Sequence, residues 1–122
     1  MFSVGTDLVE IRRIEKSMQN PRFLEKILGD EEYSQLKARE FPAQSVAANF
    51  CAKEAFVKAI GLGFTAGITL KDIEILRNAA GRPVIKLHGK AREIQQVLQQ
   101  NYSVSLTHTR EYASAVVIAW AK

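Results

Sequence analysis

The sequence predicts an α+β fold in which an antiparallel sheet packs on a long central helix. Three observations lead to this expectation. Residues 103–109 alternate strictly with a period of two, which is the pattern of a strand with two unlike faces. Residues 113–121 form a nearly continuous apolar run, typical of a buried strand. Residues 42–61 are apolar at nearly every helical position, so we expect this helix to be enclosed by the rest of the chain.

Ahead of the central helix, we expect one strand and three short helices, over residues 2–9, 10–19, 23–28 and 31–39. Small and apolar residues alternate in the strand. Asn20-Pro21 ends the first helix, because proline disfavours a helical conformation in the residue before it, and Gly29 ends the second. Asp30 is expected to cap the third helix, whose acidic first turn and basic last turn suit the helix dipole.

Beyond the central helix, we expect two hairpin strands and one more helix before the strands already described, over residues 73–77, 84–88 and 90–100. Pro42 opens the central helix at a position where proline is tolerated, and Gly61 closes it. The Asn-Ala-Ala-Gly-Arg-Pro segment at 78–83 forms the hairpin turn. No linker or internal repeat interrupts the chain, so we expect a single domain over residues 1–122.

The composition narrows the class of protein. A chain of 122 residues can bury one core of modest size, which oligomerisation would supplement. No apolar run approaches the ~18 residues of a membrane span, and Asp7 and Glu10 interrupt the stretch where a signal peptide would be apolar, so we expect a cytoplasmic protein without membrane association. The net charge of +4 favours an acidic or phosphorylated partner. Cys51 is expected to be a packed thiol.

Asp7 and Glu54 are carboxylates inside segments that otherwise look buried. Isolated carboxylates are unfavourable in such places unless a cation compensates them. Two that converge make a seat for a hard metal ion, and Mg²⁺ is held in this way by one or two carboxylates together with substrate phosphate oxygens. We therefore expect Asp7 and Glu54 to be metal ligands.

Lys58 and the glycine turn after the central helix extend this hypothesis. Lys58 lies four residues after Glu54, so the two form either an ordinary ion pair on one helix face or a metal ligand beside a lysine that neutralises a transferring phosphoryl group. Gly61 and Gly63 let backbone N–H groups approach a phosphate, although a two-glycine turn is more often only a helix cap.

Basic residues crowd the segment that follows Asp7, where apolar side chains interleave with them. The segment comprises Arg12, Arg13, Lys16, Met18, Arg22, Phe23 and Lys26. One interpretation is a solvated helix face, and the other is a docking surface for an acidic partner.

Four segments together, in the same order, resemble the holo-[acyl-carrier-protein] synthases, the short 4′-phosphopantetheinyl transferases: residues 5–11, 50–63, 81–83 and 104–109. The resemblance spans the whole chain and implies the fold of that family. It implies transfer of 4′-phosphopantetheine from coenzyme A to a serine of apo acyl carrier protein, with Mg²⁺ as cofactor and release of adenosine 3′,5′-bisphosphate, in fatty acid biosynthesis. It also implies a homotrimer with active sites at the subunit interfaces.

The resemblance assigns roles residue by residue. Asp7 and Glu54 match the metal ligands, and Glu54 and Lys58 match the catalytic pair. Coenzyme A contacts are implied for Lys58, Gly61, Gly63, Pro83, His108 and Thr109. Docking of the acidic carrier protein is implied for Arg12, Arg13, Met18, Arg22, Phe23 and Lys26, in agreement with the charge of that segment. Without the resemblance, His108 would be interpreted as a partly buried core histidine, and His88 is interpreted as structural.

Two positions depart from the family pattern, and several alternatives stay open. Asn49 stands where many members have an arginine, which removes one expected phosphate contact, and Leu62 stands within what is usually Gly-Thr-Gly.

Either Glu54 or a water molecule next to the metal could take the serine proton. The range of carrier proteins and the use of acylated coenzyme A are also open. The competing class is a basic RNA-binding module, but the predicted strands lack the interleaved aromatic and basic residues of such a surface.

Overall fold

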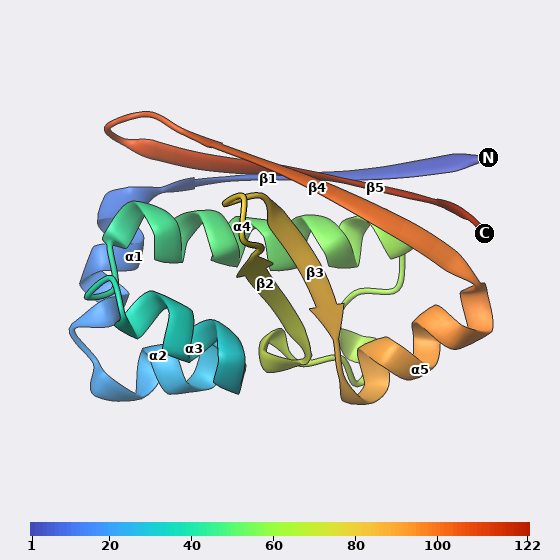
Figure 1. The fold of residues 1–122 in the computed structure, drawn as a ribbon, viewed down its shortest axis with the longest axis horizontal. Helices are drawn as coiled ribbons and strands as arrows, with labels where there is room; N and C mark the ends of the chain where they lie inside the picture. Colours follow the sequence, from blue (N-terminus) through green and yellow to red (C-terminus); the bar gives the residue numbers. More distant parts are fainter.

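A three-stranded antiparallel sheet packs along one long helix in the computed structural model, which describes residues 1–122 apart from the side chain of residue 65. The sheet consists of β1 (Phe2–Glu10), β5 (Tyr112–Ala121) and β4 (Gln100–His108), with β5 in the middle. The central helix α4 (Ala43–Ile60) runs along one face of this sheet, as Figure 1 shows. The predicted antiparallel pairing on a central helix is confirmed.

The opposite side of α4 is covered by a second layer, which includes a separate two-stranded sheet of β2 (Ile73–Arg77) and β3 (Pro83–Leu87). Short helices complete this layer: α2 (Pro21–Ile27), α3 (Asp30–Lys37) and α5 (Gly89–Leu98). Two 3₁₀ turns, Phe64–Ala66 and Leu70–Asp72, connect α4 to β2. The sequence predicted the hairpin but not its separation into a second sheet.

Small residues allow α4 to lie unusually close to β1. A Cβ atom on Gly5 would stand 1.9 Å from the carbonyl oxygen of Ala55 and 2.6 Å from the nitrogen of Ala59, so only glycine fits at this crossing. Ala55 and Ala59 are themselves buried, as expected for a helix that the rest of the chain encloses. The helix begins after Pro42 and ends at Gly61, which has φ +78°, so both predicted boundaries are confirmed.

The short helices near the N-terminus differ in detail from the prediction. α1 (Ile11–Met18) ends as expected, but Pro21 is the first residue of α2, and the Asn20 side chain caps that helix by accepting a hydrogen bond from Arg22 N–H at 3.0 Å. Asp30 is inside α3, and its expected role as the cap was wrong. Gly29 occupies the cap position, and its N–H donates to Glu32 Oε1 at 3.1 Å.

The outer face of the three-stranded sheet is bare and carries exposed apolar side chains on β1 and β5. Phe2, Val4 and Leu8 on β1 and Ile118 on β5 are exposed on this face, and no described element covers it in Figure 1. None of the helices in the described residues is long and apolar enough to cross a bilayer.

Candidate active site

Asp7 and Lys58 meet at the open edge between β1 and α4. Alternate residues of β1 face α4, which places Asp7 beside the last turns of the helix. Lys58 Nζ lies 3.3 Å from Asp7 Oδ1 and donates to the carbonyl oxygen of Thr6 at 3.0 Å. The lysine side chain is 56% exposed and the aspartate 19%, so this pair remains accessible from solvent.

Glu54 lies close enough to Asp7 for the two charges to interact. Burial raises the pKa of Glu54, the neighbouring Asp7 carboxylate raises it further, and Lys58 lowers it in part. Lys58 forms its ion pair with Asp7. The described residues therefore do not form the ordinary ion pair between Glu54 and Lys58 along the helix. Two carboxylates and one lysine therefore converge from β1 and α4.

This donor set fits a hard divalent cation that keeps water or substrate oxygens in its remaining positions. Two nearby carboxylates repel each other, and a cation between them relieves that repulsion. The described residues contain no cluster of three or more His, Cys, Asp or Glu side chains that could enclose a metal ion. Asp7 and Glu54 thus suit an open site completed by a ligand, whereas a closed structural metal site would need more protein ligands.

Cys51 lies behind Asp7 and is inert. Its side chain is fully buried, and Sγ donates to the carbonyl oxygen of Ala113 at 3.4 Å. Burial and the nearby Asp7 charge raise the pKa of the thiol to about 12. The expected packed thiol is confirmed.

The glycine turn after α4 is shaped by helix capping. The Gly61 N–H bonds to the carbonyl oxygen of Val57 at 3.1 Å, so this amide closes the helix and is already used. Gly63 has φ +68°, and Leu62 between them is exposed. The helix-cap interpretation therefore holds for Gly61, whereas phosphate contact by the turn stays a prediction.

His108 and Thr109 lie at the far end of β4, apart from Asp7. His108 is exposed, so its interpretation as a core histidine was wrong. It pairs in register with Ala113, which pairs with Val9, and β5 therefore separates the strand of His108 from that of Asp7. Thr109 Oγ1 accepts the Tyr112 N–H at 3.1 Å and so shapes the turn into β5. Within one chain, the fold therefore does not bring His108 and Thr109 next to the Asp7 and Glu54 carboxylates.

Two clefts accompany these outlying residues. A cleft of about 590 Å³ is bordered by His108, Thr109 and the start of α1, including Glu15. Another of about 500 Å³ lies between β3 and β4 and is bordered by Pro83 and Arg82. Neither cleft is bordered by Asp7, Glu54 or Lys58.

The basic segment covers α1 and α2. Its charged side chains are exposed: Arg12, Arg13, Lys16, Arg22 and Lys26. Met18 and Phe23 are half-buried and pack against the core, so they contribute to the fold as well as to this surface. A basic surface with two partly exposed apolar side chains is thus present on the same end of the molecule as the N-terminus of α4.

Comparison with known proteins identifies the family. A family model described as the 4′-phosphopantetheinyl transferase superfamily matches residues 3–117. The chain belongs to this superfamily. A holo-[acyl-carrier-protein] synthase of Syntrophus aciditrophicus is 45% identical over 121 residues, which cover 97% of this chain and 94% of the relative.

Solved structures of such synthases share the fold. The enzyme of Neisseria meningitidis matches with a TM-score of 0.89 and 27% identity, covering 97% of each chain. That of Helicobacter pylori, in complex with coenzyme A, matches with a TM-score of 0.82 and 31% identity over 96% of this chain and 99% of the other. The predicted family and fold class are confirmed, and the chain is a transferase by membership.

This transferase also contains a buried polar network that the sequence did not reveal. Lys53 and Glu32 are fully buried, with Lys53 Nζ 2.7 Å from Glu32 Oε1. Lys53 also donates to the carbonyl oxygens of Leu70 and Ile73. Glu74 accepts the Glu32 N–H at 2.7 Å and lies 2.6 Å from His88 Nε2, which gives His88 the structural role expected of it.

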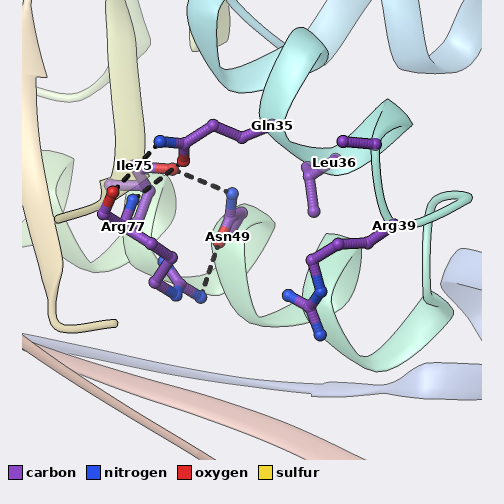
Figure 2. A pocket seen from close by; sticks show the side chains of 7 residues that line it. Gln35, Leu36, Arg39, Asn49, Ile75 and Arg77 are labelled. Atoms are coloured by element: carbon purple, nitrogen blue, oxygen red, sulfur yellow. Dashed lines mark hydrogen bonds between the residues drawn. The ribbon is translucent and has the colours of Figure 1, made fainter. Parts of the chain in front are cut away.

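Asn49 belongs to this network of the transferase and does not face the Asp7 edge. Its Nδ2 donates to Glu32 Oε2 at 3.0 Å and to the carbonyl oxygen of Ile75 at 3.1 Å. Its Oδ1 accepts from Arg77 Nη2 at 3.3 Å, as Figure 2 shows. The asparagine thus has a packing role, and it holds the Arg77 side chain.

Proposed function

We propose that Asp7, Glu54 and Lys58 form the centre at which this protein transfers 4′-phosphopantetheine from coenzyme A to a serine hydroxyl of apo acyl carrier protein. The products are the holo carrier protein and adenosine 3′,5′-bisphosphate, and the reaction serves fatty acid biosynthesis. The observation that carries the proposal is the convergence of two carboxylates and a lysine at an open edge, in a chain of this superfamily. The carrier range and the use of acylated coenzyme A are left to experiment.

Asp7 and Glu54 would hold Mg²⁺, the cofactor we propose. When bound, the ion withdraws charge from the phosphoryl group during in-line attack. Lys58 adds a positive charge that is fixed in place by the Thr6 carbonyl and Asp7. In the absence of a metal ion, burial and the Asp7 charge raise the pKa of Glu54. Glu54 is one candidate base for the serine proton, and a water molecule is the other.

We further propose a homotrimer whose sites are shared between subunits. The exposed apolar side chains on the outer face of β1 and β5 form a surface that association would bury. His108, Thr109 and Pro83 lie away from the carboxylates of their own chain. A second subunit that supplied them would complete the coenzyme A contacts proposed together with Lys58, Gly61 and Gly63.

The exposed bases of α1 and α2 are the proposed docking surface for the acidic carrier protein, with Met18 and Phe23 supplying apolar contacts. Their positive charge complements an acidic helix and would act mainly on the rate of encounter. The cytoplasmic location and the lack of nucleic acid or membrane partners stay predictions.

The decisive experiment measures the mass of apo acyl carrier protein after incubation with this protein, coenzyme A and Mg²⁺. We expect a gain equal to one phosphopantetheine, lost when Mg²⁺ is chelated and lost with Asp7→Asn. A carrier protein of unchanged mass, together with tight binding of RNA in a parallel titration, would replace the proposal with the RNA-binding alternative.

Shared sites are tested by mixing two impaired variants, Glu54→Ala and His108→Ala, under conditions in which subunits exchange. We expect partial recovery of activity, because some interfaces would combine an intact carboxylate half with an intact His108 half. A monomer in sedimentation, or a mixture no more active than the separate variants, would show that each chain carries a complete site.

A further inference from the structure

Lys58 holds one of the two oxygens of the Asp7 carboxylate. Its Nζ lies 3.3 Å from Asp7 Oδ1, and within the described residues its hydrogen bond to this carboxylate goes to Oδ1 alone. The carbonyl oxygen of Thr6, 3.0 Å away, anchors the same ammonium group. Both acceptors belong to neighbouring residues of β1, so Lys58 approaches Asp7 from a fixed direction and occupies one oxygen of the pair.

The main chain around Asp7 is fixed as well. The Ser114 hydroxyl on β5 donates to the Asp7 carbonyl oxygen at 2.9 Å. Gly5 lies against the backbone of α4, where a Cβ atom would stand 1.9 Å from the carbonyl oxygen of Ala55. A shift of β1 relative to α4 is therefore unfavourable, and Asp7 can offer both of its oxygens only if its contact with Lys58 breaks.

Glu54 is not constrained in this way. It is half-buried, and Lys58, its neighbour one turn along α4, forms its ion pair with Asp7 instead. Glu54 can therefore present both carboxylate oxygens to a ligand, whereas Asp7 presents one. The two carboxylates of the proposed centre are thus unequal as ligands.

This inequality matters because divalent cations use carboxylates in different ways. Ca²⁺ takes about six to eight oxygens and accepts both oxygens of one carboxylate, whereas Mg²⁺ requires a near-ideal octahedral arrangement and keeps several water molecules. The two cations carry the same charge, so the Lys58 ammonium repels them to a similar extent. The availability of a second oxygen is therefore what distinguishes the two cations at Asp7.

We propose that Lys58 determines which cation this centre selects: by holding Oδ1 it limits Asp7 to a single oxygen and so favours Mg²⁺ over Ca²⁺. The inference rests on the proposed function, in which Asp7 and Glu54 hold the cation. Binding of Ca²⁺ through both Asp7 oxygens requires the ion pair with Lys58 to break, whereas binding of Mg²⁺ through one oxygen leaves that pair intact. This role is separate from the proposed contact of Lys58 with coenzyme A.

Electron paramagnetic resonance of bound Mn²⁺ tests the inference on the full chain, without coenzyme A or carrier protein. Displacement of Mn²⁺ by Mg²⁺ and by Ca²⁺ gives the ratio of the Mg²⁺ affinity to the Ca²⁺ affinity. We expect Lys58→Met to lower this ratio by about two- to fivefold, the size of effect expected for one partly exposed ion pair. Lys58→Arg, which keeps a donor for Oδ1, should leave the ratio at or above that of wild type.

Lys90→Met is the matched control. Lys90 lies on α5, in the layer on the other side of α4 from β1. Its side chain is 51% exposed, against 56% for Lys58, so the variant loses the same charge from a similarly exposed position. The Mg²⁺ to Ca²⁺ ratio should be that of wild type.

Two results would overturn the inference in different ways. Equal gains in Mg²⁺ and Ca²⁺ affinity in Lys58→Met would mean that Lys58 acts only through its charge, and a loss of Mn²⁺ binding in Asp7→Asn would still support the proposed centre. Mn²⁺ bound equally well by wild type and Asp7→Asn would overturn the centre and the inference together. Because these measurements do not involve transfer, a negative carrier-protein mass assay leaves them interpretable.

Discussion

Two lysines of helix α4 each pair with a carboxylate of another element, and the two pairs differ in burial and in distance. Lys53 and Glu32 are fully buried and 2.7 Å apart, whereas Lys58 and Asp7 are partly exposed and 3.3 Å apart. Lys53 Nζ has three acceptors within the described residues, which uses every donor of an ammonium group. Lys58 Nζ has two, so one donor is left for a ligand.

The difference shows that hydrogen-bond saturation separates a structural lysine from one that can bind a reactant. The two lysines are only five positions apart on the same helix. The buried pair ties α4 to α3 and to the start of β2, and it holds the helix on which Glu54 stands. The open pair is then free to meet solvent and substrate.

The largest effect should come from breaking the buried pair. Lys53→Met leaves Glu32 charged and uncompensated, so we expect the free energy of unfolding to fall by roughly 3–5 kcal/mol. Lys58→Met, the matched control, should change it by less than about 1 kcal/mol, because that pair is exposed. Urea unfolding measures both. Equal losses in the two variants would remove the distinction between the pairs.

The second effect concerns the open carboxylates. Asp7→Asn and Glu54→Gln should each lower the transfer rate by roughly 100-fold or more, since each removes a charge that stabilises the transition state. The free energy of unfolding should not fall in either variant, because no buried partner is orphaned. Binding of Mn²⁺, followed by electron paramagnetic resonance, should weaken in both variants. Rates close to wild type at saturating Mg²⁺ would exclude the proposed centre.

A smaller effect follows from the pKa of Glu54. Burial and the Asp7 charge raise this pKa above its ordinary value of 4.5, so the folded state binds the proton more tightly than the unfolded state. The stability gained in this way is complete below pH 4.5 and is lost as the pH rises through the raised folded-state value. With metal chelated, wild type should therefore lose stability relative to Glu54→Gln as the pH rises above 4.5.

Urea unfolding at a series of pH values checks this expectation, with Glu25→Gln on the exposed side of α2 as the control. The control should follow wild type throughout. Parallel curves for wild type and Glu54→Gln would mean that folding leaves the Glu54 carboxyl unperturbed.

The smallest effect extends the comparison to basic side chains that form no ion pair among the described residues. Reversing Arg13 and Arg22 to Glu should raise KM for the carrier protein several-fold at low salt, because exposed charges steer encounter and are screened over about 8 Å at physiological salt. KM for coenzyme A should stay constant. Reversing Lys90 and Arg92 on α5 is the control. A rise only in the coenzyme A value would make the basic segment a nucleotide site.

The sequence predicted most elements because local patterns determine them. Period-two strands, the proline and glycine limits of α4 and the apolar surface of that helix were all visible in short windows. Asp7 and Glu54 were found because a carboxylate in an apolar segment is conspicuous. Lys53 was missed because its partner Glu32 lies 21 residues away and its other acceptors are backbone carbonyls, which no side-chain pattern records. The interpretation of Lys58 as an i,i+4 partner of Glu54 failed because β1 brings a closer carboxylate.

Gly5 contacts the backbone of α4, and this contact sets the distance between the two carboxylates. Asp7 follows Gly5 by two residues on β1, and Glu54 is adjacent in sequence to the Ala55 carbonyl that a Cβ atom would strike. Any larger residue at position 5 would push the strand from the helix and separate the acids. The width of the cation seat is thus determined by main-chain packing, and a substitution there would disable the centre without touching metal, nucleotide or carrier protein.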